Sequence, residues 1–506
     1  MSRIENSLRN IMVGGIGLFA GYLLNFIARR IFVHYLSIEY LGLNGLFYNI
    51  FYLLSFAELG IGTALTYSLY KPLAKNDSER VHIIVSYFRK TNFAVGAFII
   101  FVGVGLTPFL GAILKEAPDI PNLNLFYLLY IADVGLGYFL SYKRILLLAD
   151  QRKYIDTMYT SGFEIIKYSL QIIILIITKS YIFYLGVAIS VNVAENLSVT
   201  AKINSLYPYL KKPTSKKLPK DEIKTVLKNV VALISQKVGE IIVNGTDNIL
   251  IVRFVDLASA GIYGGYYMVV IAISNVIGMF NRSILASIGN LVVEENEDTH
   301  FATFLALDFI LAWIVGFCAI SLFVLLNLFI SLWLGEEYVF SIGIVFIIVL
   351  NFYVRRMLGS MRTFYSSMGL FWHDRYKALF EAGINLFVSI ILAKQYGIIG
   401  IFIGTVLSTL LTCSWYEPYI LFKHGLKKPV RIYFQNFLLN ITTVGLAGWI
   451  TQYFVNLITV SSLLLRFVIS VVICATIPNF LFLVLMGWRK DFGIIINSIK
   501  EYKKDK

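Results

Sequence analysis

Residues 303–333 read TFLALDFILAWIVGFCAISLFVLLNLFISLW, a long apolar run whose one charged side chain is Asp308. A helix needs roughly 20 mostly apolar residues to cross the hydrocarbon core of a membrane, which is about 30 Å thick. Within that core every backbone amide has to be satisfied inside the segment, and a helix achieves this. The run therefore predicts a membrane-spanning helix.

The composition of the whole chain agrees with this prediction. Of the 506 residues, 58% are hydrophobic and 15% are charged, and the mean hydropathy is +0.74, whereas a typical globular protein is about 25% charged. So few charges cannot cover a water-exposed surface, which excludes a soluble multidomain protein. The three cysteines lie in apolar runs, where we expect them to serve packing. The sequence has neither a CxxC nor an HExxH motif and its histidines do not cluster, so we predict no metal site.

Similar apolar segments recur along the chain and predict an all-α integral membrane protein with about 14 transmembrane helices. The first ten residues are polar and no clear cleavage site follows, so we expect an uncleaved first helix rather than a signal peptide. The predicted spans are 11–36, 44–69, 91–114, 124–147, 157–178, 181–201, 228–252, 260–286, 303–333, 339–361, 378–394, 398–422, 433–456 and 461–488.

Lysine and arginine concentrate in every second connection, which predicts that these connections and both termini are cytoplasmic. The same asymmetry explains the net charge of +14 better than a nucleic-acid partner does, because no basic soluble face is present. One cytoplasmic connection is acidic, with Glu294, Glu295, Glu297 and Asp298, but acidic residues carry little weight in this rule. The basic connections are 71–80, 143–153, 211–224, 375–377, 423–431 and the tail 489–506.

The first half of the chain is repeated in the second. Gly42-Leu-Asn-Gly-Leu-Phe-Tyr recurs as Gly261-Ile-Tyr-Gly-Gly-Tyr-Tyr, an offset of 219 residues (42 to 261), and Phe163-Glu164 recurs as Phe380-Glu381, an offset of 217 residues (163 to 380). An even number of spans separates the copies, as in transporters with parallel repeats. We therefore expect two pseudo-symmetric six-helix lobes around a cavity that opens alternately to each side. The predicted parts are an N-terminal lobe 1–206, a basic linker 207–228, a C-terminal lobe 229–425, two appended helices 426–488 and a cytoplasmic tail 489–506.

Charged residues within the spans are the candidate site residues, because an Arg, Lys or Asp at the centre of a bilayer costs about 2.5–3.5 kcal/mol on insertion scales. In the seventh span Lys237, Glu240, Asn244 and Asp247 fall on one helical face. This stripe is either an internal Lys237–Glu240 ion pair or a wall of the cavity. We predict a wall, in which Lys237 and Asp247 contact substrate and Glu240 is a counter-ion or coupling residue.

The tenth span carries a second polar face. Asn351, Arg355 and Arg362 share it, and Arg356 is adjacent. Arg355 lies about 24 Å from the outer end of this span, which places it in the cytoplasmic half. Arg282 of the eighth span is expected in the same layer. The alternative for Arg282 and Arg362 is that their side chains extend to the inner interface.

The first span places Arg29 and Arg30 near its outer end, where an adjacent pair points in two directions. We expect one of them to reach the cavity, and the alternative is an extension of both to the outer interface. Glu58 and Asp133 have no partner in the sequence. They are predicted to be counter-ions to the arginines, or coupling sites for H⁺ or Na⁺.

Five stretches, 149–154, 244–249, 330–335, 381–386 and 397–404, carry a family resemblance over nearly the whole chain. They read ADQRKY, NGTDNI, ISLWLG, EAGINL and GIIGIFIG. In this order and spacing they resemble the polysaccharide-transporter branch of the multidrug/oligosaccharidyl-lipid/polysaccharide exporter superfamily, the flippases of bacterial O-antigen and capsule repeat units.

This resemblance implies a transporter, not an enzyme, in the bacterial cytoplasmic membrane. Its substrate would be an undecaprenyl-diphosphate-linked oligosaccharide, carried from the inner to the outer leaflet among membrane lipids and other polysaccharide assembly proteins. A diphosphate is a bidentate target for guanidinium groups. We predict that Arg355, Arg356 and Arg282 receive it and that Arg29 or Arg30 draws it across, while the prenyl chain stays in lipid beside the last two helices.

Three other functions compete with this one. An ion-coupled multidrug exporter of the same superfamily would favour an acidic cavity. A membrane polysaccharide polymerase would need a sizeable outside loop with catalytic groups. A scaffold protein would not transport anything. No Walker A motif is present in the sequence. We therefore predict no cofactor and a supply of energy from an H⁺ or Na⁺ gradient, the membrane potential or removal of the product.

Overall fold

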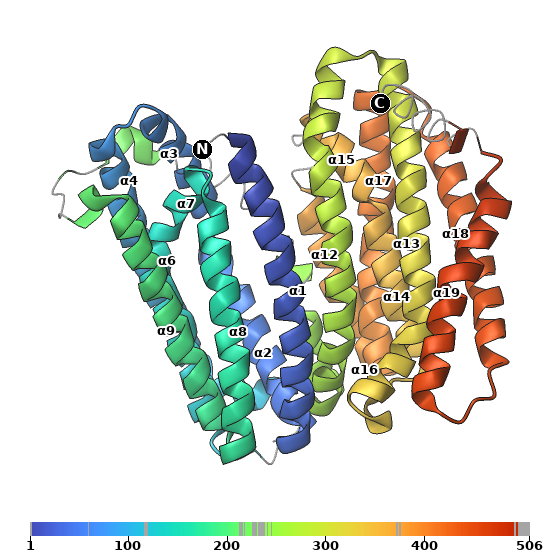
Figure 1. The fold of residues 1–506 in the computed structure, drawn as a ribbon, viewed down its shortest axis with the longest axis horizontal. Helices are drawn as coiled ribbons and strands as arrows, with labels where there is room; N and C mark the ends of the chain where they lie inside the picture. Colours follow the sequence, from blue (N-terminus) through green and yellow to red (C-terminus); the bar gives the residue numbers. More distant parts are fainter. Residues whose placement is uncertain are drawn as a thin grey trace. The chain divides into compact units, whose positions relative to one another are not determined.

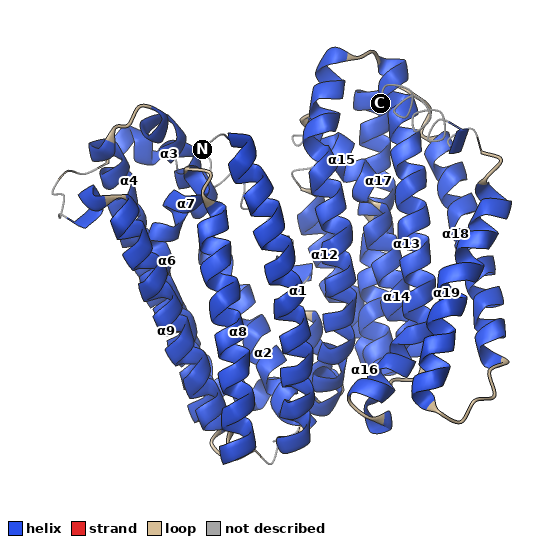
Figure 2. Cartoon of the chain, viewed as in Figure 1, coloured by secondary structure: helices blue, strands red, loops and turns tan. Residues whose placement is uncertain are grey.

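The computed structural model describes residues 3–58, 60–115, 120–211, 216, 218–224, 230, 238–239, 241–243, 245–370, 373, 376–489 and 492–493. Within these residues the chain is helical and has no strand, as Figure 2 shows. The all-α prediction is confirmed. Nine of the described helices are long and apolar enough to cross a membrane, and the total of about 14 spans stays a prediction.

The chain divides into two compact units, Met1–Gly261 and Ile262–Lys506. The division lies after the predicted linker 207–228 and near the start of a long helix, α12 (Leu257–Glu294). Much of the segment between residues 212 and 244 is outside the described residues, so the predicted lobe boundaries stay predictions.

Unit 1 is built from long helices that pack side by side (Figure 1). Helix α8 packs along α1 and α9, and α6 packs against both α4 and α9. Its elements are α1 (Arg3–Tyr35), α2 (Ile38–Leu54), η1 (Ser55–Glu58), α3 (Ile61–Ala74), α4 (Ser78–Leu106), η2 (Thr107–Phe109), α5 (Leu110–Ile113), α6 (Leu123–Ser141), η3 (Tyr142–Arg144), α7 (Ile145–Ala149), α8 (Lys153–Thr178), α9 (Tyr181–Leu206), η4 (Pro208–Lys211) and α11 (Asp247–Phe254).

The predicted second span, 44–69, is not one continuous helix. Helix α2 ends at Leu54, η1 ends at Glu58, and α3 begins after Gly60. Gly60 has φ +77°, a left-handed conformation that glycine adopts without a steric penalty. The expectation of an unbroken helix was therefore wrong, and the interruption places Glu58 at a helix end.

The described part of the predicted linker is docked on unit 1. Leu210, Leu218 and Ile223 pack into the same apolar cluster as residues of α3, α4, α7 and α9. Two ion pairs join this segment to the start of α4, Lys216–Glu79 and Glu222–Arg80. The linker is therefore part of the packed unit in these places.

Unit 2 surrounds α13 (Glu297–Trp333), which packs against α14, α18 and α19. Many side chains on α13 are buried because this helix has neighbours on several sides. The other elements of the unit are the rest of α12, η5 (Glu336–Tyr338), α14 (Ile342–Met357), α15 (Gly359–Ser367), α16 (Lys377–Leu411), α17 (Cys413–Ile420), the π-helix η7 (Leu421–Leu426), α18 (Arg431–Asn456) and α19 (Leu463–Met486).

Helix α16 contains a tight reversal at Gly397, where φ is 55° and ψ is −129°. Its second half returns along the first, so that Asn385 Nδ2 donates to Thr405 Oγ1 at 3.0 Å. The backbones approach closely because Gly400 has no side chain: a Cβ there would collide with the carbonyl of Leu392. The reversal lies between the predicted spans 378–394 and 398–422.

The start of α2 meets the start of α12 at two glycines. A Cβ on Gly42 would collide with the carbonyl oxygen of Leu257, and a Cβ on Gly261 would collide with that of Ile38. Under the offset of 219 residues (42 to 261), Ile38 corresponds to Leu257 and Gly42 to Gly261. The two contacts are thus copies of each other, as in a self-complementary contact across a two-fold axis. The arrangement of the chain in two repeated lobes stays a prediction.

The acidic connection after α12 has basic partners far away in the sequence. Lys427 pairs with Glu297, and Lys428 Nζ lies 2.7 Å from Asp298 Oδ1. Two of the four acidic residues that depart from the predicted charge pattern therefore pair with a basic connection that was predicted to be on the same side of the membrane.

Candidate functional site

Four basic side chains gather in unit 2 where α14, α15 and α16 end or begin. Arg355 and Arg356 are in the last turn of α14, Arg362 is on α15, and Lys377 is the first residue of α16. Arg355 lies thirteen residues after Ile342, about 20 Å along α14. We call these four residues the cationic cluster.

Glu417 of α17 holds two members of this cluster. Arg362 Nε lies 3.1 Å from Glu417 Oε2 and Arg362 Nη2 lies 3.2 Å from Oε1. Lys377 Nζ also donates to Glu417 Oε1. The Glu417 side chain is buried, and a buried carboxylate needs such cations to offset the loss of water. Arg362 is therefore bound to a carboxylate and braces α15 against α17, which neither prediction for it anticipated.

Glu381 of α16 approaches Arg355 more loosely. Arg355 Nη2 lies 3.7 Å from Glu381 Oε1, which is beyond hydrogen-bond distance. Neutral donors bind the same carboxylate, Thr409 Oγ1 at 3.0 Å and Cys413 Sγ at 3.2 Å. Glu381 is therefore held mainly by neutral groups, while Arg355 stays within reach as a cation.

Arg356 has no hydrogen-bond or ion-pair partner among the described residues, although its side chain is partly buried. Arg355 and Arg362 lie close enough to repel it electrostatically, and Tyr267 is a further neighbour. The cluster forms ion pairs with two carboxylates of the described residues, Glu381 and Glu417. Guanidinium groups bind anions through charge-assisted hydrogen bonds, so Arg356 is the candidate anion-binding group.

Arg282 of α12 follows a residue that contacts the region of the cluster. A Cβ on Gly359, at the junction of α14 and α15, would collide with the side-chain amide of Asn281. Arg282 itself is exposed, and its guanidinium lies beside Gly278 of its own helix. Its predicted place in one layer with the other arginines stays a prediction.

The two arginines of the first span differ, as the adjacent pair predicted. Arg29 is partly buried and its Nη2 donates to the carbonyl of Gly261 at 3.0 Å, whereas Arg30 is exposed. The Nε atom of Arg29 is buried and has no hydrogen-bond partner in the described part of the chain. Arg29 therefore stabilises the junction of α1 with the start of α12. A role in substrate binding stays a prediction for both arginines.

Glu58 and Asp133 in unit 1 both bind neutral partners. Tyr138 donates to Glu58. Asp133 Oδ1 accepts from Asn192 Nδ2 at 2.7 Å, and Asn196 Nδ2 donates in turn to Asn192 Oδ1 at 2.7 Å. These contacts hold each carboxylate in place, and the predicted coupling role is untested.

The polar stripe of the seventh span falls mostly outside the described residues. Lys237, Glu240 and Asn244 lie outside them, whereas Asp247 is the first residue of α11. An acidic side chain in the first turn of a helix is favourable because it faces the positive end of the helix dipole. The predicted cavity wall stays a prediction.

One cluster of charges was not predicted. Arg144 of η3 pairs with Asp156 at 3.1 Å and with Glu195 at 2.7 Å, and Lys153 pairs with Asp156 at 2.5 Å. The basic residues of this connection were predicted only to mark the orientation of the chain in the membrane. Two features of the sequence indicate these ion pairs. Asp156 lies three residues after Lys153, and Glu195 lies inside an apolar span.

A second contact ties the same connection to the end of α9. The hydroxyl of Tyr207 donates to Asp150 Oδ2 at 2.6 Å. Burial and this hydrogen bond raise the pKa of the Tyr207 hydroxyl, so it stays protonated and remains a donor. These contacts fix the conformation of the connection between α7 and α8, which contains the ADQRKY stretch at 149–154.

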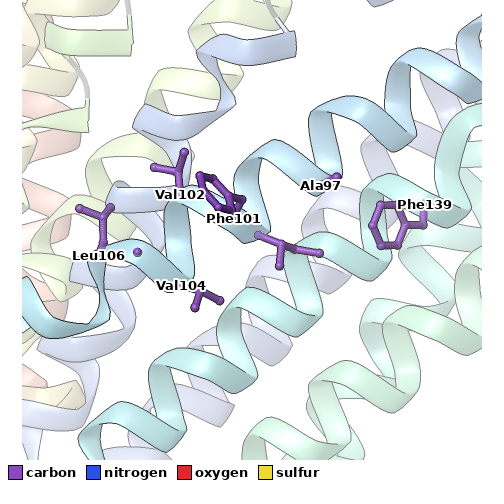
Figure 3. A pocket seen from close by; sticks show the side chains of 8 residues that line it. Ala97, Phe101, Val102, Val104, Leu106 and Phe139 are labelled. Carbon is purple, nitrogen blue, oxygen red and sulfur yellow. The ribbon is translucent and has the colours of Figure 1, made fainter.

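A hollow in unit 1 has a volume of about 750 Å³ (Figure 3). It contains none of the predicted site residues and no charged side chain, so it does not suit a diphosphate. The apolar lining of this hollow suits hydrocarbon chains. The lining residues come from α4 and α6: Ala97, Ile100, Phe101, Val102, Val104, Gly105, Leu106 and Phe139.

Comparison with known proteins finds likeness in structure. No protein-family model matches the chain, and no curated protein does. Among solved structures, the lipid II flippase MurJ in an inward closed conformation has a TM-score of 0.69 and 13% identity, covering 94% of this chain and 98% of that chain. An inward-facing multidrug resistance MATE family transporter of the MOP superfamily has a TM-score of 0.63 and 14% identity, covering 80% and 96%. A mutant of the MATE transporter VcmN of Vibrio cholerae has a TM-score of 0.56 and 14% identity, covering 84% and 99%.

At these identities the likeness shows the fold. Together with the apolar helices, it shows a multi-pass membrane protein. The chain has the all-helical fold that it shares with these solved structures, the lipid II flippase MurJ and the MATE transporters.

Proposed function

We propose that this protein is a flippase of the bacterial cytoplasmic membrane. It moves undecaprenyl-diphosphate-linked oligosaccharide repeat units from the inner to the outer leaflet by alternating access, for the synthesis of O-antigen or capsule. The family resemblance of the sequence and the likeness of the fold to a lipid II flippase support this proposal. The observation that carries it is the guanidinium of Arg356, which no described residue binds, inside the cationic cluster.

The charge of the cluster suits a diphosphate. A diphosphate that joins a lipid to a sugar has two negative charges, and the cluster presents the guanidinium of Arg356, to which no described residue is bound. Guanidinium groups bind phosphate oxygens through two parallel hydrogen bonds. Partial burial of Arg356 strengthens this attraction, because the surroundings screen it less than water does.

The transport path in this proposal runs from the cytoplasmic side outward. Arg356, Arg355 and Arg282 receive the diphosphate from the inner leaflet, and the sugars follow through a polar cavity. The prenyl chain stays in lipid beside α18 and α19. Glu58 and Asp133 bind H⁺ or Na⁺ for coupling, and both termini are cytoplasmic.

Substitution of Arg356 tests the proposal. Arg356→Ala should weaken the binding of undecaprenyl diphosphate to the purified protein at least tenfold, since a charge-assisted hydrogen bond contributes about 1.5–3 kcal/mol. Arg356→Lys should retain part of the affinity, because it keeps the charge and loses the bidentate geometry. Surface polysaccharide should fall in parallel in cells with equal amounts of each protein.

Arg431→Ala is the matched control, because Arg431 is an exposed arginine at the start of α18 in the same unit. It should bind and transport like the wild-type protein. Unchanged binding and polysaccharide output with Arg356→Ala would exclude the cluster as the receptor.

A multidrug exporter is the second candidate, favoured by the MATE transporters among the solved structures and by the half-buried carboxylate of Asp133. Its substrates would be organic cations bound by carboxylates. Reconstituted vesicles separate the two functions: ion-driven accumulation of an organic cation would support the exporter, and translocation of undecaprenyl-diphosphate sugars would support the flippase.

A further inference from the structure

Helix α8 of unit 1 is a candidate membrane span with two different sides. Ile166 and Leu170 are exposed, as expected of a side that contacts lipid. Lys167 and Tyr168, between them in the sequence, are half-buried. A charged side chain within a span is costly unless it faces the interior of the protein or water. The polar side of α8 therefore faces the interior of unit 1.

Helix α2 has an accessible side that is aromatic and polar. Asn44, Tyr48 and Tyr52 lie on this side at intervals of four residues. The rings of Tyr48 and Tyr52 are nearly parallel, at 10° with centroids 6.2 Å apart, and Tyr48 is 62% exposed. Tyr48 lies ten residues after Ile38, about 15 Å along the helix, whereas tyrosines that anchor helices lie at the membrane interfaces. Tyr48 therefore presents an accessible ring well inside the span.

Four tyrosines from four helices come together in unit 1. Tyr130 of α6 lies close enough to Tyr48 and to Tyr184 of α9 to interact electrostatically, and Tyr184 is likewise a neighbour of Tyr168 of α8. Phe51 of α2 stacks on Tyr130, with ring centroids 6.3 Å apart and an angle of 7°, and so fixes the position of that ring. We call Tyr48, Tyr130, Tyr168 and Tyr184 the tyrosine face.

Three hydroxyls of the tyrosine face do not hold the unit together. The hydroxyls of Tyr130, Tyr168 and Tyr184 form no hydrogen bond with any described residue. These side chains are half-buried and their hydroxyls reach solvent, whereas the hydroxyl of Tyr127 in the same unit is buried without a partner. A tyrosine hydroxyl both donates and accepts hydrogen bonds. The three hydroxyls are therefore available to a ligand.

The charges near the tyrosine face favour an uncharged ligand. Lys167 lies close to two carboxylates, those of Asp133 and Glu164. The carboxylates would repel a diphosphate, and the lysine would repel an organic cation. A sugar meets neither obstacle. Its C–H groups are weakly positive and suit the negative face of an aromatic ring, and its hydroxyls match those of tyrosine.

We propose that the tyrosine face binds a sugar of the lipid-linked oligosaccharide, whose pyranose ring stacks on Tyr48 while its hydroxyls bond to those of Tyr130, Tyr168 or Tyr184. This inference rests on the proposed flippase function. It assigns the sugar to residues other than the arginines proposed to receive the diphosphate. The two contributions to binding can therefore be measured separately.

Tyr48→Ala tests the proposal, because it removes the ring on which the sugar stacks. Binding to the full-length protein in detergent is measured with two probes, undecaprenyl diphosphate and the same lipid carrying N-acetylglucosamine. The wild-type protein should prefer the sugar-bearing probe about fivefold, an effect similar to that of stacking two aromatic rings. Tyr48→Ala should lose this preference and keep the wild-type affinity for the bare diphosphate. Tyr48→Phe retains the ring and should retain the preference.

Tyr67→Ala is the matched control. Tyr67 is an exposed tyrosine of α3 in the same unit, and its ring also contacts a second tyrosine, Tyr70. The control should bind both probes like the wild-type protein. Tyr130→Phe keeps the ring beside Phe51 and should lower the preference for the sugar about twofold, as expected for the loss of one neutral hydrogen bond. The melting temperature of each variant checks that it folds.

The outcomes separate this inference from the proposed function. If Arg356→Ala weakens the binding of both probes but a folded Tyr48→Ala variant keeps the preference for the sugar, the inference is wrong and the flippase proposal stands. The same holds if the wild-type protein binds both probes equally well. If it binds neither probe, both proposals are overturned. Binding of tetraphenylphosphonium that Tyr48→Ala abolishes would instead assign the tyrosine face to organic cations, as a multidrug exporter requires.

Discussion

Arg356 and Arg362 are six residues apart, and their surroundings give them opposite roles. Arg362 satisfies a buried carboxylate on another helix, whereas no described residue bonds to Arg356. The spacing of the arginines indicated a shared polar layer. It could not indicate the partners, because Glu417 is fifty-five residues away from Arg362 in the sequence.

Arg362→Ala is expected to lower the stability of the protein. Removing one partner of a buried ion pair costs about 3–5 kcal/mol, and we expect the lower end because Lys377 remains bound to Glu417 and the Arg362 side chain is 50% exposed. Arg356→Ala should leave the melting temperature unchanged or raise it, because it removes like-charge repulsion. Thermal unfolding in detergent measures both. Equal losses for the two variants would contradict the assignment of Arg362 as the brace.

Asp133→Asn tests the predicted coupling site in unit 1. Asparagine keeps the shape of the side chain and can still accept from Asn192, so the variant should fold. It cannot take up a proton or hold a cation by charge. We expect the variant to lose stimulation of transport by an H⁺ or Na⁺ gradient in reconstituted vesicles, whereas Asp77→Asn, at the cap of α4, should keep it. Full stimulation in Asp133→Asn would exclude this residue from coupling.

At the scale of elements, the sequence predicted the helices well and their interruptions poorly. Long apolar runs dominate the pattern, because lipid requires each backbone group to be satisfied within its own helix. The break near Gly60 was missed because isolated glycines, here Gly60 and Gly62, are compatible with a continuous helix, and the choice depends on tertiary contacts. The reversal at Gly397 was located because it separates two apolar runs, and Gly400 and Gly404 follow it closely.

The close packing of the α16 hairpin can be tested with two glycines of the same helix. Gly400→Ala should lower the yield of folded protein and its melting temperature, because the new Cβ would collide with the carbonyl of Leu392. Gly383→Ala is the control, since no atom lies within 4 Å of its new Cβ. We expect the control to match or exceed the wild-type melting temperature. If Gly400→Ala and Gly383→Ala had the same melting temperature, the two halves of α16 would not be packed as closely at Gly400 as the structure indicates.

At the scale of the whole chain, the repeat makes a prediction of its own. Gly42 and Gly261 make the same contact on corresponding residues, so Gly42→Ala and Gly261→Ala should lower the melting temperature by similar amounts. Gly186→Ala in α9 is the control, because its Cβ would meet no atom within 4 Å. The double variant should lose less melting temperature than the two single variants together, because the same separation of α2 from α12 relieves both clashes. Very different single losses would argue against a two-fold related contact.

Much of the candidate site depends on contacts that run between distant segments. The sequence located Arg355, Arg356 and Arg282 because a charged residue inside an apolar span is conspicuous. Glu381 and Glu417 are equally unusual in their spans, but only the antiparallel hairpin and the helix after it bring them to the arginines. Helical periodicity describes one helix at a time, so it cannot assign charges to pairs.

Lys427 and Lys428 show how one feature can serve two stages in the life of the protein. In the predicted orientation, their charges retain this segment on the cytoplasmic side while the chain is being inserted. Once the helices have assembled, Glu297 and Asp298 bind the same two lysines. The charges that direct insertion in this prediction are thus partly neutralised by acidic partners in the folded protein, so they should attract anionic headgroups less than unpaired lysines would.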